Sequence, residues 1–113
     1  MIKRDRIKLI KEMLSSNSTD PFLNYAAALE YNKIGDKEKS INLLLGIVNN
    51  NPEYLGAYYQ LGKLYEEQNQ SDKAIVIFKK GRKVALEQNN QKTLGELTEA
   101  LMLVDDEFDG SFD

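Results

Sequence analysis

Residues 58–78, which read YYQLGKLYEEQNQSDKAIVIF, are the stretch that decides the fold of this 113-residue chain. Tyr58, Leu61 and Tyr65 follow one another at intervals of three and four residues. Side chains at these intervals lie on one face of an α-helix. Gly62 stands beside them without a side chain, so a second helix can approach closely. The first part of the stretch therefore predicts a helix with an aromatic packing face.

The second part of the stretch predicts another helix that packs on the first. Asn69-Gln70-Ser71 is a polar break, and asparagine is the non-glycine residue that best tolerates a positive φ. Beyond the break, Ala74 and Phe78 are four residues apart and share a helix face. Ala74 is small where we expect the two helices to cross. Phe78 is large enough to fill the space between this pair of helices and a neighbouring pair.

The same spacing recurs along the chain with a period of 34 residues. Ile7, Ile41 and Ile75 keep this interval. The other residues that keep it are Ile10, Leu44 and Phe78, then Tyr25 and Tyr59, and Tyr31 and Tyr65. A fixed period of this length is typical of stacked repeats, in which each unit covers its neighbour's apolar face. The period therefore favours a surface that binds another molecule over a catalyst.

Polar breaks divide the chain into six expected helices. We place them at about 2–15, 21–34, 37–49, 53–68, 72–88 and 92–104. Asp20 is a good N-cap, and Pro21 suits the first helical position. Gly35 allows a left-handed C-cap, and Asp36 can cap the helix that follows. No segment shows sustained period-two alternation, so the sequence predicts an all-α fold without a sheet.

The two helices of the opening stretch resemble a tetratricopeptide repeat, whose pattern is W-x2-L-G-x2-Y…A-x3-F…P. The residues that carry the resemblance are Tyr58-x2-Leu61-Gly62-x2-Tyr65 and Ala74-x3-Phe78, with Tyr58 in the Trp place. The preceding unit follows the pattern more loosely, through Asn24, Ala27, Ala28, Tyr31, Ser40, Leu44 and Pro52.

This resemblance implies a right-handed α-solenoid of antiparallel helix pairs. It implies one helical domain, 1–104, with repeats at about 21–54 and 55–88 and a capping helix at about 92–104. The first helix is similar to the second half of a preceding unit through Ile7, Ile10 and Met13. Residues 105–113 are acidic, and we expect them to be disordered.

Departures from the pattern indicate where the array ends. Asn24 stands in the leading aromatic place of the first unit, and Leu86 stands where the second unit would close with Pro. Leu94, Leu97 and Leu101 of the last helix match the pattern of the preceding unit's first helix, but at an offset of 36 residues, two more than the repeat. We interpret this slip as the mark of a cap, and we expect a complete short module rather than a fragment of a longer array.

The resemblance also implies a partner-binding groove, lined by the first helix of each unit. The groove residues that follow from the family's register are Phe22, Tyr25, Leu29 and Asn32, then Tyr59, Lys63 and Glu66. The apolar members form an amphipathic patch suited to an extended peptide or a helix. The alternative is that the N-terminal helix folds over this patch, and the sequence does not separate the two arrangements.

One tetratricopeptide subclass binds the C-terminal carboxylate of chaperones through Lys, Asn and Arg at fixed groove positions. The corresponding places in this chain are Tyr25, Leu29, Gln60, Lys92 and Glu96. Only Lys92 has a suitable side chain, so we expect no carboxylate clamp of that kind.

The net charge of −3 is unevenly distributed. Residues 1–14 carry five Lys/Arg and two Asp/Glu, a local charge of +3, and residues 105–113 carry five acids, a local −5. One interpretation is two solvated chain ends. The other is head-to-tail attraction between copies, which salt would weaken. The second interpretation gives an alternative function, a self-associating scaffold that forms a weak homodimer or larger oligomer through its end helices.

Composition and motifs argue against most other functions. The chain has no Cys and no His, which removes thiolate metal sites, disulfides and the commonest general base. We find no nucleophile motif or phosphate loop, so we predict no enzyme, no cofactor and no metal. Asp105-x-Glu107-x-Asp109-Gly110 imitates the start of an EF-hand loop, but the required twelfth-position Glu is missing.

Nucleic acid and membrane are also unsuitable partners. Lys79, Lys80, Arg82 and Lys83 form a basic cluster, but it spreads around its helix and the chain as a whole is acidic. No apolar run is long enough for a membrane span, and the N-terminus lacks the apolar core of a secretory signal. We therefore predict a cytoplasmic, non-catalytic module that binds a protein or peptide of unknown identity.

Overall fold

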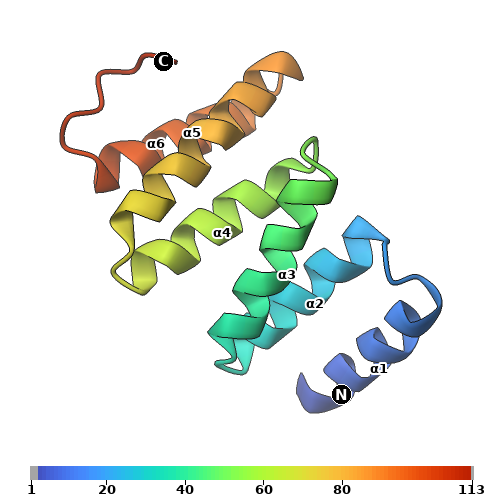
Figure 1. Ribbon diagram of the computed structural model, residues 1–113. Helices are drawn as coiled ribbons and strands as arrows, with labels where there is room; N and C mark the ends of the chain where they lie inside the picture. The colour runs from blue at the N-terminus through green and yellow to red at the C-terminus, as the bar shows by residue number, and fades with distance from the viewer. Residues whose placement is uncertain (1–2, 113) are drawn as a thin grey trace. The chain divides into compact units, whose positions relative to one another are not determined.

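The computed structural model describes residues 3–112, and it describes side chains from residue 5 onward. Within the described residues, six α-helices follow one another (Figure 1). Their bounds are α1 Lys3–Ser16, α2 Pro21–Lys33, α3 Lys37–Asn50, α4 Leu55–Glu67, α5 Ser71–Glu87 and α6 Gln91–Val104. No strand occurs between residues 3 and 112, which agrees with the all-α prediction. The chain forms two compact units that divide between Tyr54 and Leu55.

The first unit contains α1, α2 and α3, and α2 packs against both of the others. Its core contains Ala28 and Leu44, which are almost fully buried. The Ser40 hydroxyl donates to the Ala28 carbonyl oxygen at 2.7 Å, so the helices cross where both side chains are small. Small residues at a crossing allow the two backbones to approach closely.

The helix α1 joins this core through the predicted Ile7 and Ile10, but Leu14 takes the place predicted for Met13. Ile7 is buried with Ala27 and Tyr31, and Ile10 and Leu14 pack around them. Met13, predicted to share this face, is exposed. Leu14 lies seven residues after Ile7, nearly two full helical turns, and therefore continues its stripe more closely than Met13 does.

The turns of the first unit use the expected residues. Asp20 Oδ1 accepts from the Phe22 and Leu23 amides at 2.9 and 3.3 Å, which caps α2. Gly35 has φ +91, and Asp36 Oδ1 accepts from the Lys39 amide at 3.1 Å to cap α3. These observations confirm the two predicted N-caps and the left-handed conformation predicted for Gly35.

The helix α4 begins at Leu55, two residues later than predicted. Pro52 and Glu53 lie in a turn, in which the Tyr54 amide donates to the Asn51 carbonyl at 2.9 Å. Proline has a fixed φ that suits a turn as well as a first helical turn, and this local hydrogen bond favours the turn.

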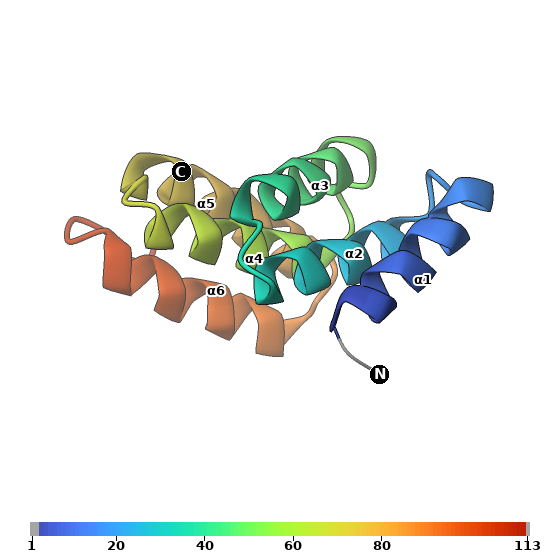
Figure 2. The same cartoon turned by 90° about the horizontal axis from the view of Figure 1, so that it is seen from below.

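The second unit contains α4, α5 and α6, with α5 packed against both neighbours, and Figure 2 shows α6 alongside it. Phe78, Leu61 and Leu97 are fully buried at its centre. A Cβ built on Gly62 would overlap the Phe78 ring. A Cβ on Gly81 would lie 2.7 Å from the Tyr58 Cβ. The close approach predicted at Gly62 is therefore present, and Gly81 provides a second one.

After α6 the chain turns back along the second unit. Asp105 ends the helix, and residues 105–112 return toward α5, where Arg82 binds the carbonyl oxygens of Gly110 and Ser111 (Figures 1 and 2). The composition of this segment predicts disorder, and the structure gives it a defined path instead. The reason is an anchor from another helix, which composition does not reveal.

Candidate functional site

The face of α2 that the repeat register assigns to the groove carries Phe22, Tyr25, Leu29 and Asn32. These residues are three, seven and ten positions apart from the first, so they share one side of the helix. Phe22 is 64% exposed, whereas the other three are half-buried. The Asn32 side-chain oxygen accepts from Lys37 Nζ at 2.8 Å, so the polar end of this face is held in place.

Tyr25 is supported by a residue that the sequence analysis did not single out. The Tyr25 and Tyr54 rings lie 5.3 Å apart between centroids at an angle of 50°. The pKa of Tyr54 is raised above 10.0, mainly by burial and to a smaller extent by the neighbouring Tyr25 and Asp20. In the repeat, Tyr54 is equivalent to Asp20, the N-cap of α2, which lies 34 residues earlier. Its position in the repeat therefore did not predict an aromatic contact.

The helix α1 does not cover the most exposed member of this face. Its apolar residues pack on Ala27 and Tyr31, which belong to another side of α2. Phe22 therefore remains largely exposed. Of the two arrangements that the sequence left open, the structure shows an accessible Phe22.

The corresponding face of α4 carries Tyr59, Lys63 and Glu66, all half-buried. The Tyr59 ring is tilted against the Phe78 ring, with 6.5 Å between centroids. Lys63 Nζ and Glu66 Oε2 are 3.6 Å apart, within ion-pair range but too long for a hydrogen bond. This face is more polar than that of α2.

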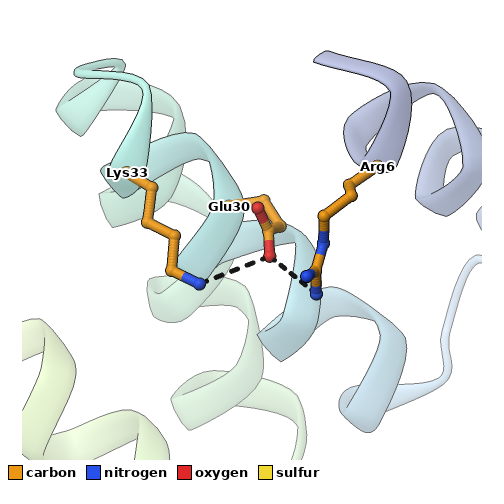
Figure 3. A network of polar contacts seen from close by, with 3 residues as sticks. All are labelled: Arg6, Glu30 and Lys33. Carbon is orange, nitrogen blue, oxygen red and sulfur yellow. Dashed lines mark ion pairs between the residues drawn. The ribbon is translucent and has the colours of Figure 1, made fainter. Parts of the chain in front are cut away.

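A buried charge lies where α1 meets α2. The Glu30 side chain is buried, and its Oε1 lies 3.0 Å from Arg6 Nη2 and 3.6 Å from Lys33 Nζ (Figure 3). Its Oε2 has no hydrogen-bond partner among the described residues. This buried charge was not predicted, although a glutamate within the apolar run AAALEY is a signal for one.

The basic cluster on α5 is divided by the structure. Lys80 and Lys83 are exposed, but Arg82 is only 4% exposed. Its guanidinium binds Thr98 of α6 and the segment after α6. The cluster is therefore not one continuous basic surface.

Two further features of the described residues concern metal ions and membranes. No group of three metal-binding side chains is present there. In the segment that imitates an EF-hand start, Asp105 and Asp109 each accept a main-chain amide two residues on. No described helix is both long and apolar enough to cross a membrane. The cytoplasmic location stays a prediction.

Comparisons with known proteins agree with the helix pairs described above. A profile of the tetratricopeptide repeat matches residues 55–83. The solution structure of a tetratricopeptide repeat domain protein from Salinibacter ruber is 37% identical, with a TM-score of 0.74. The alignment covers 81% of this chain and 93% of that one. A crystal structure of such a domain from the same organism is 40% identical, with a TM-score of 0.73, and the coverage is 75% and 96%.

A more distant similarity concerns the fold alone. The crystal structure of MamA is 24% identical with a TM-score of 0.70, and the alignment covers 92% of this chain and 57% of MamA. No functionally curated protein matches the chain. The structural similarities confirm the predicted class, an all-α helical-repeat solenoid.

Proposed function

The chain belongs to the tetratricopeptide repeat family, and on that premise we propose that it is a non-catalytic module that binds a peptide or a helix of a partner protein. Such repeats generally mediate protein–protein interactions. The proposed contacts are Phe22, Tyr25, Leu29 and Asn32 on α2, and Tyr59, Lys63 and Glu66 on α4.

The observation that carries this proposal is the exposure of Phe22. A phenylalanine that is 64% exposed leaves a large apolar surface in water, next to the half-buried Tyr25 and Leu29. Aromatic side chains that become buried in a partner contribute much of the binding free energy. A helix with apolar side chains at intervals of three and four residues would match the spacing of this face.

The face of α4 supplies contacts of another kind. Tyr59 offers an aromatic ring, and Lys63 and Glu66 offer charges of both signs at partial exposure. Partly exposed charges contribute more to the selection of a partner than to its affinity. We therefore assign apolar anchoring to α2 and polar selection to α4.

The test is partner capture from the native cell with the intact chain and its Phe22→Ala and Tyr59→Ala variants. Truncation of an anchoring aromatic residue costs about 2 kcal/mol, or roughly 30-fold in affinity. We expect the Phe22→Ala variant to lose the captured protein, and the Tyr59→Ala variant to lose it in part.

Leu86→Ala is the matched control, because Leu86 is also a large exposed apolar residue on a helix. Retention of the partner by folded Phe22→Ala and Tyr59→Ala variants would contradict the proposal. Equal loss with Leu86→Ala would show that capture depends on general apolar exposure instead.

A second candidate function is self-association through the first and last helices. Met102 and Leu103 of α6 are 62% and 71% exposed, and Leu9 and Met13 of α1 are also exposed. Adjacent exposed apolar residues on α6 favour contact with another protein surface, and a second copy offers the face of α1. Sedimentation velocity over a range of concentrations tests this, because a monomer at every concentration would rule it out.

A further inference from the structure

The guanidinium of Arg82 is surrounded on several sides by groups of its own chain. Its Nε donates to the Thr98 hydroxyl at 2.9 Å. Its Nη1 donates to the Ser111 carbonyl at 2.7 Å, and its Nη2 donates to the Gly110 carbonyl at 3.1 Å. The three accepting oxygens are neutral, and two of them belong to the main chain.

Two aromatic rings of the same segment complete the contact. The centre of the guanidinium lies 4.7 Å from the Phe108 ring centroid and 4.1 Å from that of Phe112. Both distances are within the range of a cation–π interaction, for which arginine is well suited. Burial lowers the pKa of Arg82 because it disfavours the charged form. The buried charge is therefore stabilised by main-chain carbonyls and aromatic faces.

We propose that Arg82 and Thr98 form a peptide-recognition site for a Phe-x-Gly-x-Phe segment, and that residues 108–112 of the chain occupy it in this structure. The ligand in trans is the same segment of a second copy. This site uses α5 and α6, and it is independent of the proposed contacts on α2 and α4.

Each fixed position of the Phe-x-Gly-x-Phe pattern has a structural role. The two phenylalanines are four residues apart and both contact the guanidinium. Gly110 has φ +92, a conformation that other residues rarely adopt, and its carbonyl accepts from Arg82. The intervening Asp109 and Ser111 side chains are exposed, so they contribute less to recognition.

The incomplete burial of both rings favours exchange of the segment. Phe108 is half-buried and Phe112 is 37% exposed, so neither ring enters the core of the second unit. The attached segment binds in cis because its effective concentration is about millimolar. A peptide of the same sequence at a comparable concentration would compete with it.

The test uses the full chain with Phe108→Ala and Phe112→Ala, which vacates the site, and a fluorescent peptide of residues 105–112. We expect saturable binding to this variant, and binding at least about tenfold weaker to the unaltered chain, whose own segment competes. Arg82→Lys in the vacated background should weaken binding about tenfold, because lysine lacks the planar fork of donors. Lys83→Ala in that background is the matched control.

Failure of the peptide to bind the vacated chain would overturn the proposal, as would equal binding by the Arg82→Lys and Lys83→Ala variants. If Arg82→Lys impairs folding, Thr98→Ala tests the same site with the loss of one hydrogen bond. In the otherwise unaltered chain, Thr98→Ala should also increase hydrogen exchange at the Ser111 amide, which donates to Asp109 in the docked segment, and unchanged exchange would count against the site.

Discussion

Gly62 determines how closely α4 and α5 approach each other. A Cβ at this position would overlap the ring of Phe78, which is fully buried and cannot move without displacing its neighbours. We expect Gly62→Ala to lower the free energy of unfolding by roughly 1–3 kcal/mol, the usual range for overpacking a core. Denaturant titration followed by circular dichroism measures this change.

Gly95→Ala is the matched control for that substitution. Gly95 is exposed on α6, and a Cβ there would meet no atom within 4 Å. Alanine is favoured over glycine in a helix by about 1 kcal/mol, so this variant should be more stable than the parent. If both variants change stability in the same direction, packing at Gly62 is not the reason.

Asp109 makes the conformation of the docked segment sensitive to acid. The Ser111 amide and then its hydroxyl, with a smaller effect from Lys79, lower the Asp109 pKa below its ordinary value of 3.8. Because its pKa is lowered, the ionised Asp109 carboxylate stabilises the turn above pH 3.8. This stabilisation is lost as the pH falls through the pKa of the folded state. NMR titration of the Asp109 carboxyl should give a midpoint below 3.8 in the intact chain. In Ser111→Ala the midpoint should move upward, and a midpoint at or above 3.8 in the intact chain would contradict the assigned hydrogen bonds.

Residues whose roles depend on their own helix or turn were predictable from the sequence. Asn69 has φ 60, and Gly35 has φ +91, because the repeat requires a left-handed residue at both places. Glu30 and Arg82 were not predictable, since their partners come from another helix or from the segment after α6. The period reports which side of a helix a residue occupies, but not which distant polar group lies opposite.

The helices α3 and α5 occupy equivalent places in the two repeats, yet they begin with different caps. The Asp36 carboxylate caps α3, whereas Gln70, 34 residues later, makes no side-chain cap for α5. Gln70 Oε1 is also buried without a hydrogen-bond partner among the described residues. We expect Gln70→Asp to raise the free energy of unfolding by about 1 kcal/mol.

Thermal and denaturant unfolding measure the effect of this transferred cap. Gln70→Asn should stabilise α5 similarly, because asparagine is also a good N-cap. Gln70→Leu, which has no acceptor, is the matched negative control. A gain in stability with leucine as large as that with aspartate would assign the effect to burial rather than to capping.

The helix α1 is attached to α2 by one apolar stripe and by the ion pair between Arg6 and Glu30. Arg6→Ala would leave the buried Glu30 carboxylate with only the more distant Lys33. Because Arg6 is itself about half exposed, we expect a loss of roughly 1–2 kcal/mol, less than for a fully buried pair.

Hydrogen exchange locates this effect within the chain. The α1 amides should exchange faster in Arg6→Ala, whereas the α5 amides of the second unit should be unchanged. Lys8→Ala is the control, since Lys8 is an exposed residue of the same helix. Faster exchange in both variants would indicate a change in helix propensity instead of the loss of the ion pair.

Helix positions were more predictable than the contacts made by the chain ends. Caps and breaks placed each helix end within about two residues, because these signals are local. The exposed Met13 and the docked residues 105–112 were not predicted. Both depend on what a neighbouring helix presents, and a single sequence does not show that.

For the whole molecule, the 34-residue period was sufficient to predict the fold class. Repeated small and aromatic positions specify the same helix pair twice, and Ala28, Ala74 and Phe78 are fully buried as that pattern requires. The candidate contact faces followed from register, but their exposure did not. Whether Phe22 is covered depends on how α1 docks, which is a property of the folded unit.

The charge distribution and the exposed end helices lead to a prediction about assembly. Residues 1–14 carry a charge of +3, from five Lys/Arg and two acids. Residues 105–113 carry −5, from five acids. Attraction between exposed charges is screened within about 10 Å at 0.1 M salt, whereas apolar contact persists. If copies associate through Met102 and Leu103, added salt should weaken the association only partly.

We therefore expect the weight-average mass in sedimentation velocity to rise with protein concentration. Met102→Glu combined with Leu103→Glu should keep the chain monomeric, because it places two charges where apolar surface would be buried. Val76→Glu, a similar change at an exposed residue of α5, is the matched control and should associate like the parent chain. An unaltered chain that stays monomeric at high concentration and low salt would exclude assembly through α6.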